Sequence, residues 1–336
     1  MRKTLNKLKI FANFATGRHI FDIYPSQVAL EVTNRCNLAC VICPHGKMTR
    51  PKGLMPFEKF RTYVDKTARH AEFIYLYGIG ESLLHPDLDK MIDYAQSAGI
   101  YTYLSTNAMP MDEKWSARLL TSRLKSLTFA LDGFTKAQYE AIRVKGRFET
   151  VIENIRAFLR LKKQMRRRMH VVIQTVATDE TPGDAGQLTG LFSDAELSQV
   201  SQIRVKPFYD SFPERRDEAC GLVRKCFFLW NFLFAYQDGR VGLCCVDYDG
   251  QTILGDLNEQ DCREIWNSKR LRKIRRAYHK RRSDALPLCR TCRLPEISGF
   301  GSCMLLASSL VPTGVSRKLL PLYEKLRLRK LRPAAP

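Results

Sequence analysis

The sequence lacks any apolar run close to the roughly 20 residues that a membrane-spanning helix needs, and it contains no internal repeat. Its first residues are basic, but Lys7 and Lys9 interrupt the apolar residues around them, so no signal peptide is expected. A short amphipathic helix is predicted there instead. These absences argue against a membrane-spanning or secreted protein, and we expect a cytoplasmic location.

Acidic residues are scarce relative to basic ones. The chain has 34 aspartates and glutamates against 55 lysines and arginines, a net charge of +21. Such an excess is typical of proteins with anionic partners, such as nucleic acid, acidic lipid or a phosphorylated substrate. The charge concentrates in the segments 166–168, 269–282 and 317–332. These are either solvated helix faces or contact surfaces, and the last two predict weak contact with the inner face of an anionic membrane.

Cysteine, by contrast, is abundant, with eleven residues in a chain of 336. In a cytosolic chain these thiols are expected to stay reduced and to bind metal rather than to form disulfides. Hydrophobic residues make up 45% of the sequence, which is enough for a sizeable core. The length fits one large α/β domain with a smaller one, or two mid-sized domains.

Three cysteines, Cys36, Cys40 and Cys43, follow an apolar run that predicts a strand ending in a loop. Their C-x3-C-x2-C spacing lets the thiolates converge on one metal centre. Because an ordinary ferredoxin cluster takes four cysteines, three local ones leave either a distant fourth ligand or one iron without a protein ligand. A zinc site is the alternative, although zinc sites more often pair two C-x2-C knuckles or include histidines.

Strand-like and helix-like runs alternate through residues 28–207, which is typical of a parallel sheet with crossover helices. The predicted strands are 28–33, 73–77, 101–105, 126–131, 170–177 and 202–207. The predicted helices are 57–66, 88–98, 112–120, 148–164 and 185–197. Six such units predict an α/β fold with a partial, TIM-like (β/α)6 barrel. The cysteine loop follows the first strand, at the strand ends where barrel folds place their chemistry.

The pattern changes near residue 208. Residues 220–303 hold eight of the eleven cysteines, and Asp238-Gly239 predicts a hairpin turn there. A small cysteine-rich domain buries little core and usually relies on metal. We therefore predict an N-terminal helix in 1–24, the partial barrel in 25–208, the cysteine-rich domain in 209–311 and a basic helix or tail in 312–336.

The cysteine loop resembles the signature of the radical S-adenosylmethionine (SAM) enzymes. The resemblance implies a [4Fe–4S] cluster on Cys36, Cys40 and Cys43, whose open iron chelates SAM. An electron from the cluster then cleaves SAM to methionine and a 5′-deoxyadenosyl radical, which abstracts a substrate hydrogen. The same resemblance implies an electron donor such as flavodoxin or ferredoxin. Ile42 departs from the family, which usually has an aromatic residue at that position.

Three further segments resemble this family in chain order. They are similar to its G-x-G-E-P, T-N-G and S-L-D-G…Y…I-R segments, with Ser82 in place of the proline and Ala130 in place of the serine. The SAM-binding residues that the resemblance implies are Gly78, Gly80, Glu81, Ser105, Thr106, Asn107 and Arg143. Taken singly, each segment also fits a glycine turn, a polar turn or, for Arg143, a surface salt bridge.

A second cysteine set resembles the ligands of the SPASM/twitch extension of these enzymes, which binds an auxiliary [4Fe–4S] cluster with no open iron. The implied ligands are Cys226, Cys244, Cys289 and Cys292. Cys245 is adjacent to Cys244 and is an alternative ligand. A structural zinc ribbon is the alternative site. Cys220, Cys262 and Cys303 stay outside both predicted sets.

The resemblance implies a radical SAM oxidoreductase or maturase that abstracts hydrogen from a sugar-like alcohol or a peptide. Gln174 and Lys206 lie near strand ends and are nominated as substrate-side residues. The alternative is a metal-stabilised binding module whose basic surface binds nucleic acid or anionic membrane. That alternative accounts for the cysteines, but it does not predict Glu81 or Asn107 in strand order.

Overall fold

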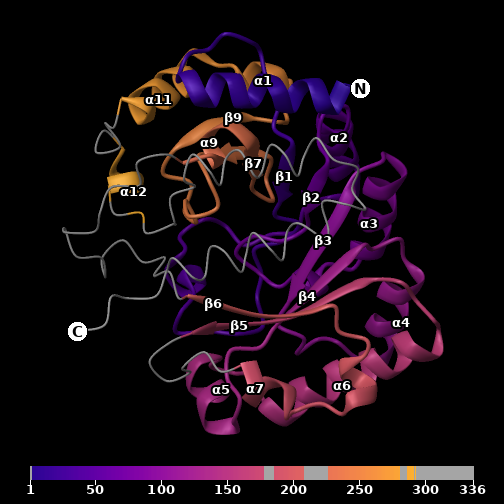
Figure 1. The fold of residues 1–336 in the computed structure, drawn as a ribbon. Coiled ribbons are helices and arrows are strands. Elements are labelled where there is room, and N and C mark those ends of the chain that lie inside the picture. The colour runs from indigo at the N-terminus through magenta and orange to yellow at the C-terminus, as the bar shows by residue number, and fades with distance from the viewer. Residues whose placement is uncertain (1, 178–184, 208–225, 281–285, 291, 293–336) are drawn as a thin grey trace.

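The computed structural model describes residues 2–177, 185–207, 226–280, 286–290 and 292. Its centre is a nine-stranded sheet in the order β6-β5-β4-β3-β2-β1-β7-β8-β9 (Figure 1). The strands are β1 (Gln27–Leu30), β2 (Phe73–Tyr75), β3 (Tyr101–Thr106), β4 (Ser126–Ala130), β5 (His170–Ala177), β6 (Gln202–Pro207), β7 (Phe232–Ala235), β8 (Arg240–Gly242) and β9 (Ile253–Asp256).

The six strands β1 to β6 pair in parallel and are connected by helices, as the alternating pattern predicted. The sheet stays open, so the predicted partial barrel is confirmed. The connecting helices are α2 (Phe57–Ala68), α3 (Leu88–Ser97), α4 (Glu113–Thr121), α5 (Lys136–Ile142), α6 (Phe148–Gln164), α7 (Ala185–Thr189) and α8 (Asp194–Leu197). Two short 3-10 helices, η1 (Pro44–Lys47) and η2 (Ser82–Leu84), lie in the loops after β1 and β2.

The prediction of one helix over 185–197 is wrong. Helix α7 ends at Thr189, and Gly190 follows it. A new helix then begins at Ser193, whose hydroxyl accepts from the Glu196 amide while the Glu196 carboxylate accepts from the Ser193 amide. This capping box gives the second segment its own N-terminus, so the apolar pattern across 185–197 belongs to two helices.

The two faces of the sheet differ in composition. On the outer face, Val28, Leu30 and Ile74 join the main core beneath the helices. On the inner face, which we define as the side carrying Ala29, the register aligns Ala29 with Tyr75 of β2 and Phe234 of β7. The inner face is therefore rich in aromatic side chains, whereas the outer face is mostly aliphatic, with Phe129 of β4 as an exception.

The cysteine-rich region extends the same sheet rather than forming a separate one. Its strand β7 pairs in parallel with β1, and β7 turns into the antiparallel β8. Gly239 in that turn has φ +100°, a conformation that favours glycine, as the predicted hairpin requires. The division at residue 208 remains a prediction about the sequence, because strands from both sides of it share one sheet. The remaining helices are α9 (Phe228–Asn231), α10 (Cys262–Trp266), α11 (Lys269–His279) and α12 (Pro287–Arg290).

The predicted N-terminal helix is α1 (Arg2–Thr16), which lies beside α11 at the top of Figure 1. Ile10 and Phe14 are buried, and the Phe14 ring meets Trp230 of α9 edge-on at 5.2 Å. Within the described residues, no helix combines the length and apolarity needed to cross a membrane. Cys220, Cys303 and the predicted tail 312–336 lie outside the described residues.

Candidate active site

The cysteine loop leaves the C-terminal end of β1 and is held by Asn34. The Asn34 side chain donates to the Pro51 carbonyl at 3.0 Å and accepts from the Gly53 amide at 2.8 Å. Further along, the backbone amides of Ala39 and Val41 donate to the carbonyls of Val144 and Ile142, each at 3.0 Å. The loop is therefore fixed at both its start and its middle, which limits where its thiols can point.

Cys36, Cys40 and Cys43 are all partly buried free thiols. Burial raises the pKa of Cys36 to about 11, with smaller contributions from Glu81, Cys40 and Cys43. The pKa of Cys43 is also raised, mainly by burial and then by Cys40. Burial and mutual repulsion thus disfavour the free thiolate forms, and a bound cationic centre would stabilise them.

Within the described ranges, no three histidine, cysteine or carboxylate side chains converge on a single metal ion. A tetrahedral zinc site needs its thiolates about 2.3 Å from one ion. A four-iron cluster instead takes one thiolate per iron and spreads its ligands more widely. The donor set, three cysteines in one loop, is one that an iron–sulfur cluster with an open iron can take.

Glu81 lies in the loop after β2 and links the segments that follow β1, β2 and β3. Its buried carboxylate accepts from the Thr106 hydroxyl at 2.8 Å and from the Asn107 amide at 2.7 Å. The Asn107 side chain then donates to Asn37 of the cysteine loop at 2.9 Å. Burial raises the pKa of Glu81, and the hydrogen bonds from Asn107, Leu83 and Thr106 oppose that rise. Three of the predicted SAM-binding residues thus form one network with the cysteine loop.

The two glycines of the same loop are required by close packing. A Cβ on Gly78 would lie 2.8 Å from Oε2 of Glu31, and a Cβ on Gly80 would lie 2.5 Å from the Thr33 carbonyl oxygen. Gly80 therefore allows the Glu81 loop to pack directly on the cysteine loop. Ser105 is partly buried on β3, one residue before Thr106.

Arg143 follows α5 and lies against the cysteine loop. Its guanidinium is paired with Asp132, with Nη2 and Oδ2 at 2.5 Å, and Nη1 donates to the Cys40 sulfur at 3.8 Å. The arginine is thus a buried ion-pair partner and a fixed positive charge beside a predicted cluster ligand. The alternative of a surface salt bridge is wrong for this residue, because Asp132 is 1% exposed.

Glu31 and Arg50 form a buried pair that the sequence interpretation missed. Arg50 Nη1 and Nη2 donate to the two Glu31 oxygens at 2.9 and 3.0 Å. Arg50 Nε also donates to the Tyr248 carbonyl, and its guanidinium lies 4.1 Å from the Tyr236 ring centroid. Glu31 in turn accepts from the Ile79 amide. The sequence offered only a single glutamate within the predicted strand 28–33, and this glutamate belongs to no recognisable motif.

The predicted auxiliary ligands lie near one another, since thiols of the set raise the pKa of other thiols in it. The pKa of Cys226 is raised to about 12 by burial, with Cys292 and Cys289 among the smaller causes. Cys244 is raised by burial and then by Cys245, Cys226 and Cys289. Cys244 packs against the main core with Cys226, whereas Cys245 packs against the inner-face aromatic cluster. Cys244 therefore packs with Cys226, whereas Cys245 packs on the inner face of the sheet, where Cys292 also contributes to its raised pKa.

Cys262 is buried in α10, away from both sets. Burial raises its pKa to about 12, and the other contributors are Asp261 and Lys66. Its side chain belongs to the main core.

Comparison with known families agrees with this geometry. A model of the radical SAM superfamily matches residues 30–184, and a model of the SPASM iron–sulfur cluster-binding domain matches residues 226–293. The chain contains a radical SAM domain followed by a SPASM domain. This assignment accounts for Glu81 and Asn107 as well as the cysteines, so the metal-stabilised binding module is not needed to explain them.

Individual relatives are more distant. The chain is 30% identical to the mycofactocin maturase of Mycobacterium ulcerans over 136 residues. This match covers 40% of this chain and 37% of that protein. It is 23% identical over 301 residues to the AdoMet-dependent heme synthase of Methanosarcina barkeri, covering 75% and 85%. Among solved structures, SuiB of Streptococcus suis with its precursor peptide SuiA has a TM-score of 0.62, 14% identity and coverage of 86% and 75%.

The radical SAM domain implies a [4Fe–4S] cluster bound with SAM, and the SPASM domain implies auxiliary iron–sulfur binding. The first three thiols fit a cluster with one open iron, because no fourth cysteine lies in their loop. The second set offers four thiols and fits a closed cluster. Which residues hold each group is our proposal, based on these positions.

Substituting Cys226, Cys244, Cys289 or Cys292 by alanine is expected to lower iron and sulfide content by about one cluster. SAM cleavage should survive in part, because the open-site thiols lie in another loop. Metal and sulfide analysis after anaerobic reconstitution measures this. Cys245→Ala is the matched control and should keep the cluster because its side chain faces the sheet. Zinc at these cysteines after strictly anaerobic preparation would contradict the assignment.

Proposed function

We propose that this radical SAM enzyme is a maturase that abstracts hydrogen from a peptide substrate on the inner face of its open sheet. The observation that carries the proposal is the network joining Glu81, Thr106 and Asn107 to the cysteine loop. The similarity to a mycofactocin maturase and to the fold of SuiB favours a peptide over a sugar-like alcohol.

When bound, the cluster and SAM supply the 5′-deoxyadenosyl radical that takes the substrate hydrogen. The protein's own residues would hold and orient the reactants. Glu81 offers a buried carboxylate for the methionyl ammonium of SAM. Arg143 keeps a positive charge beside Cys40, which favours the thiolate form of that ligand.

The inner face offers a substrate surface with both aromatic and cationic parts. The Tyr75 and Tyr103 rings stack there at 5.1 Å. The strand register places Gln174 beside Arg204, and Lys206 two residues further along the same face. This arrangement supports a substrate with an apolar or aromatic side chain near a carboxylate or another acceptor.

Lys206 also approaches the SPASM domain. Burial raises the pKa of Cys245 to about 11, and the positive charge of Lys206 opposes that rise. Tyr77 lies near the same thiol, and burial raises the pKa of the Tyr77 hydroxyl well above its ordinary value. The substrate surface would thus lie between the open-site cluster and the auxiliary cluster, which could take up the electron left after hydrogen abstraction.

The proposed electron donor is an acidic carrier such as flavodoxin or ferredoxin. The net charge of +21 favours encounter with an acidic partner, because complementary charge accelerates association.

The test of the proposed function uses anaerobically reconstituted enzyme with two substrate pools, deuterated peptides and deuterated sugar-like alcohols. Deuterium in 5′-deoxyadenosine with the peptide pool is expected. Transfer from the alcohol pool alone would contradict the peptide assignment, and transfer from neither would count against both classes.

Lys206→Met is expected to lower this deuterium transfer at least about tenfold, since a charged hydrogen bond contributes about 1.5–3 kcal/mol. SAM cleavage without substrate should persist, because Lys206 is remote from Cys36, Cys40 and Cys43 in the sequence and lies on β6. Equal transfer by the variant and the native enzyme would remove Lys206 from the substrate surface. Lys125→Met, which changes a lysine just before β4, is the control.

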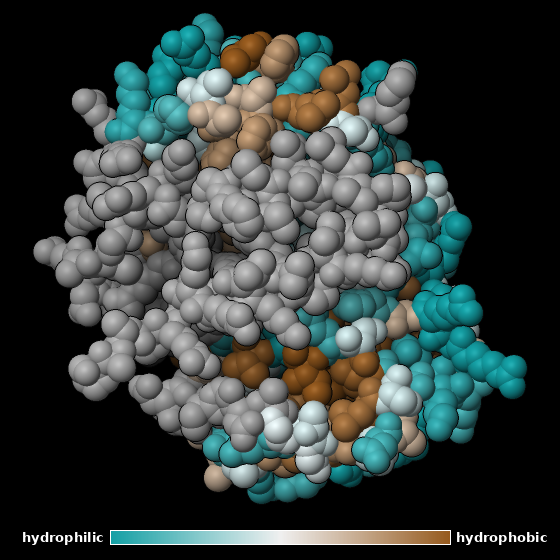
Figure 2. All heavy atoms as spheres, in the orientation of Figure 1, coloured by the Kyte–Doolittle hydropathy of each residue, from teal (hydrophilic) through white to brown (hydrophobic). Residues whose placement is uncertain are grey.

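We also propose weak peripheral contact with the inner face of an anionic membrane. Four exposed apolar side chains lie in the first part of the chain: Leu5 at 52%, Leu8 at 43%, Ile20 at 50% and Phe21 at 41% exposure. Apolar atoms also gather over α1 at the top of Figure 2. The predicted basic contribution of 269–282 is smaller than its sequence suggested, because Arg270, Arg272 and Arg275 hold partners within the protein.

The double substitution Leu5→Ser and Leu8→Ser is expected to lower recovery with anionic vesicles at least about tenfold in a flotation assay at low salt. Inserting one leucine side chain contributes about 1.5–3 kcal/mol, and each nearby basic residue about 1 kcal/mol. Met165→Ser is the control, because Met165 is 42% exposed at the far end of α6. Equal recovery of the double variant and the control would contradict membrane contact through α1. Equal recovery of the full-length chain and a chain truncated at 312 would exclude a contribution from the tail.

A further inference from the structure

A hollow between the end of α1 and helix α11 is lined by five basic side chains together with Asn13, Gly17 and Trp230. Its floor includes Asn13 of α1, and its walls carry the cationic side chains of Arg18, Arg272, Arg275 and Arg276. An adjoining hollow of about 590 Å³ shares Arg18, Arg272 and Arg276 and adds His279 and Lys280, whereas Arg275 lines only the first hollow, of about 10 Å³. The larger volume lies within the range of small-molecule sites, about 300–1,000 Å³.

The loop between α1 and β1 is shaped to form this hollow. The Asn13 side chain accepts from the Ile20 and Phe21 amides and donates to the Phe21 carbonyl at 2.7 Å. Gly17 has φ +65°, and a Cβ there would lie 1.9 Å from the His279 ring. The loop therefore packs directly on the end of α11 and holds Arg18 opposite that helix.

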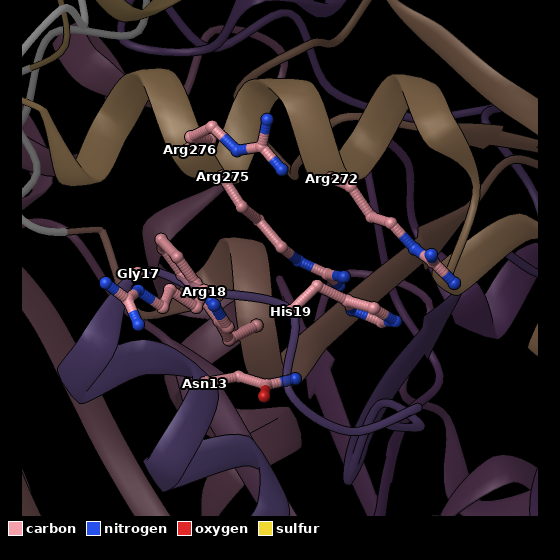
Figure 3. Close-up of a pocket in the computed structure, with 8 residues that line it drawn as sticks. Asn13, Gly17, Arg18, His19, Arg272, Arg275 and Arg276 are labelled. Atoms are coloured by element: carbon pink, nitrogen blue, oxygen red, sulfur yellow. The ribbon is translucent and has the colours of Figure 1, made fainter.

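Arg275 is the unusual residue of the hollow. It is 4% exposed, and it donates from Nε to the Leu229 carbonyl at 2.7 Å and from Nη1 to the Trp266 carbonyl at 2.8 Å. Its Nη2 is buried and has no hydrogen-bond partner among the described residues. In Figure 3, the side chain extends from α11 toward the loop that carries Arg18 and His19.

The guanidinium of Arg275 lies 4.9 Å from the Trp266 ring centroid, but it has no acidic partner within the described ranges. Among the described residues, the ion pairs of α11 are confined to Arg272 with Asp22 at 3.3 Å, and Asp22 is shared with Arg263 and His19. Within the part of the chain that the structure describes, the Nε of Arg272 is likewise buried without a hydrogen-bond partner. Buried charges in proteins are normally paired, because an unpaired one is costly to desolvate. A group that accepts hydrogen bonds and carries negative charge would satisfy both guanidinium groups.

We propose that the hollow between α1 and α11 is a binding site for the phosphate group of a phosphate ester. The planar forks of Arg275 and Arg272 suit phosphate oxygens, which accept parallel hydrogen bonds. Arg276 and Arg18 would close the site from its exposed rim. The shared chemistry is the phosphate, which either a free phosphate ester or a phospholipid headgroup can supply.

The test measures binding to the reconstituted holoenzyme by calorimetry and thermal shift, at constant ionic strength. The first probe is inorganic phosphate with chloride as the reference ion, and the second is phosphatidylglycerol vesicles with phosphatidylcholine vesicles as the reference. Saturable binding of at least one probe is expected. Phosphate binding alone assigns a free ester, and vesicle binding alone assigns a headgroup. Binding of neither probe would overturn the proposal.

Matched variants separate a site from general charge attraction. Arg276→Gln and Lys273→Gln each remove one positive charge from an exposed position on α11, but only Arg276 lines the hollow. We expect about tenfold weaker binding for Arg276→Gln, the size typical of a lost charged hydrogen bond, and no more than about a twofold change for Lys273→Gln. Equal weakening by the two variants would overturn the site.

Arg275→Lys tests the interior of the hollow. It keeps the positive charge but removes the unpartnered Nη2, so the response to the bound probe is expected to disappear. Iron content and the far-UV spectrum establish that the variant is folded. If this substitution prevents folding, Arg272→Gln replaces it, with the same expected loss. Unchanged binding by a folded interior variant would contradict the assignment.

Discussion

Replacing Cys36, Cys40 and Cys43 with alanine is expected to abolish 5′-deoxyadenosine formation. Each thiolate would hold one iron of a cluster that has no spare ligand in its loop, so each single variant should lose the activity as well. The assay is detection of 5′-deoxyadenosine from anaerobically reconstituted enzyme with a strong reductant.

Cys262→Ala is the matched control for this experiment. It also replaces a buried cysteine, but Cys262 packs in the core with α10 and lies among Asp261 and Lys66 rather than other thiols. Normal 5′-deoxyadenosine formation by the control and none by the triple variant would support the ligand assignment. Normal 5′-deoxyadenosine formation by the triple variant would contradict the ligand assignment.

The second large effect concerns stability. Arg50→Ala is expected to lower the free energy of unfolding by about 3–5 kcal/mol, the usual cost of leaving a buried charge without its partner. Glu31 would lose both of its arginine hydrogen bonds, and the Tyr248 carbonyl would lose another. Chemical denaturation of the reconstituted protein measures the change.

Arg61→Ala is the control for Arg50→Ala. Arg61 also pairs with a glutamate, Glu58 at 3.0 Å, but on an exposed helix surface where solvent screens the pair. A small change is therefore expected for Arg61. The double variant Glu31→Gln with Arg50→Met should recover part of the loss, because it removes both buried charges. Similar losses for Arg50→Ala and Arg61→Ala would show that the buried pair has no special role.

The same pair positions the candidate site as well as stabilising the fold. Arg50 ties the end of β1 to the SPASM domain through Tyr236 and Tyr248, and Glu31 holds the loop before Glu81 through the Ile79 amide. Loss of the pair would therefore loosen the cysteine loop and the Glu81 loop together. A lower SAM affinity in folded Arg50→Ala protein would be consistent with that role.

Most of the fold and much of the candidate site could be predicted from the chain because their signals are local. The helix over Phe148–Gln164 and the strand over His170–Ala177 have the predicted bounds, since periodic apolar residues mark them. The helix over 185–197 could not be predicted correctly. The apolar pattern continues past Gly190 and Ser193, so it indicates one helix. The break between the two helices depends on the capping box that Ser193 forms in the folded chain.

The sequence by itself determined the kind of chemistry, because three cysteines within eight residues and a second set further along limit the possible metal centres whatever the fold. It also determined the open parallel sheet, since strand and helix periods depend only on neighbouring residues. The tertiary structure alone decided the contacts between distant segments. It placed β7 on the free edge of β1, turned Cys244 and Cys245 to opposite sides, paired Glu31 with Arg50, and brought Arg18 opposite Arg275. Such contacts depend on which surfaces meet when the core is buried, and no local spacing in the chain records that outcome.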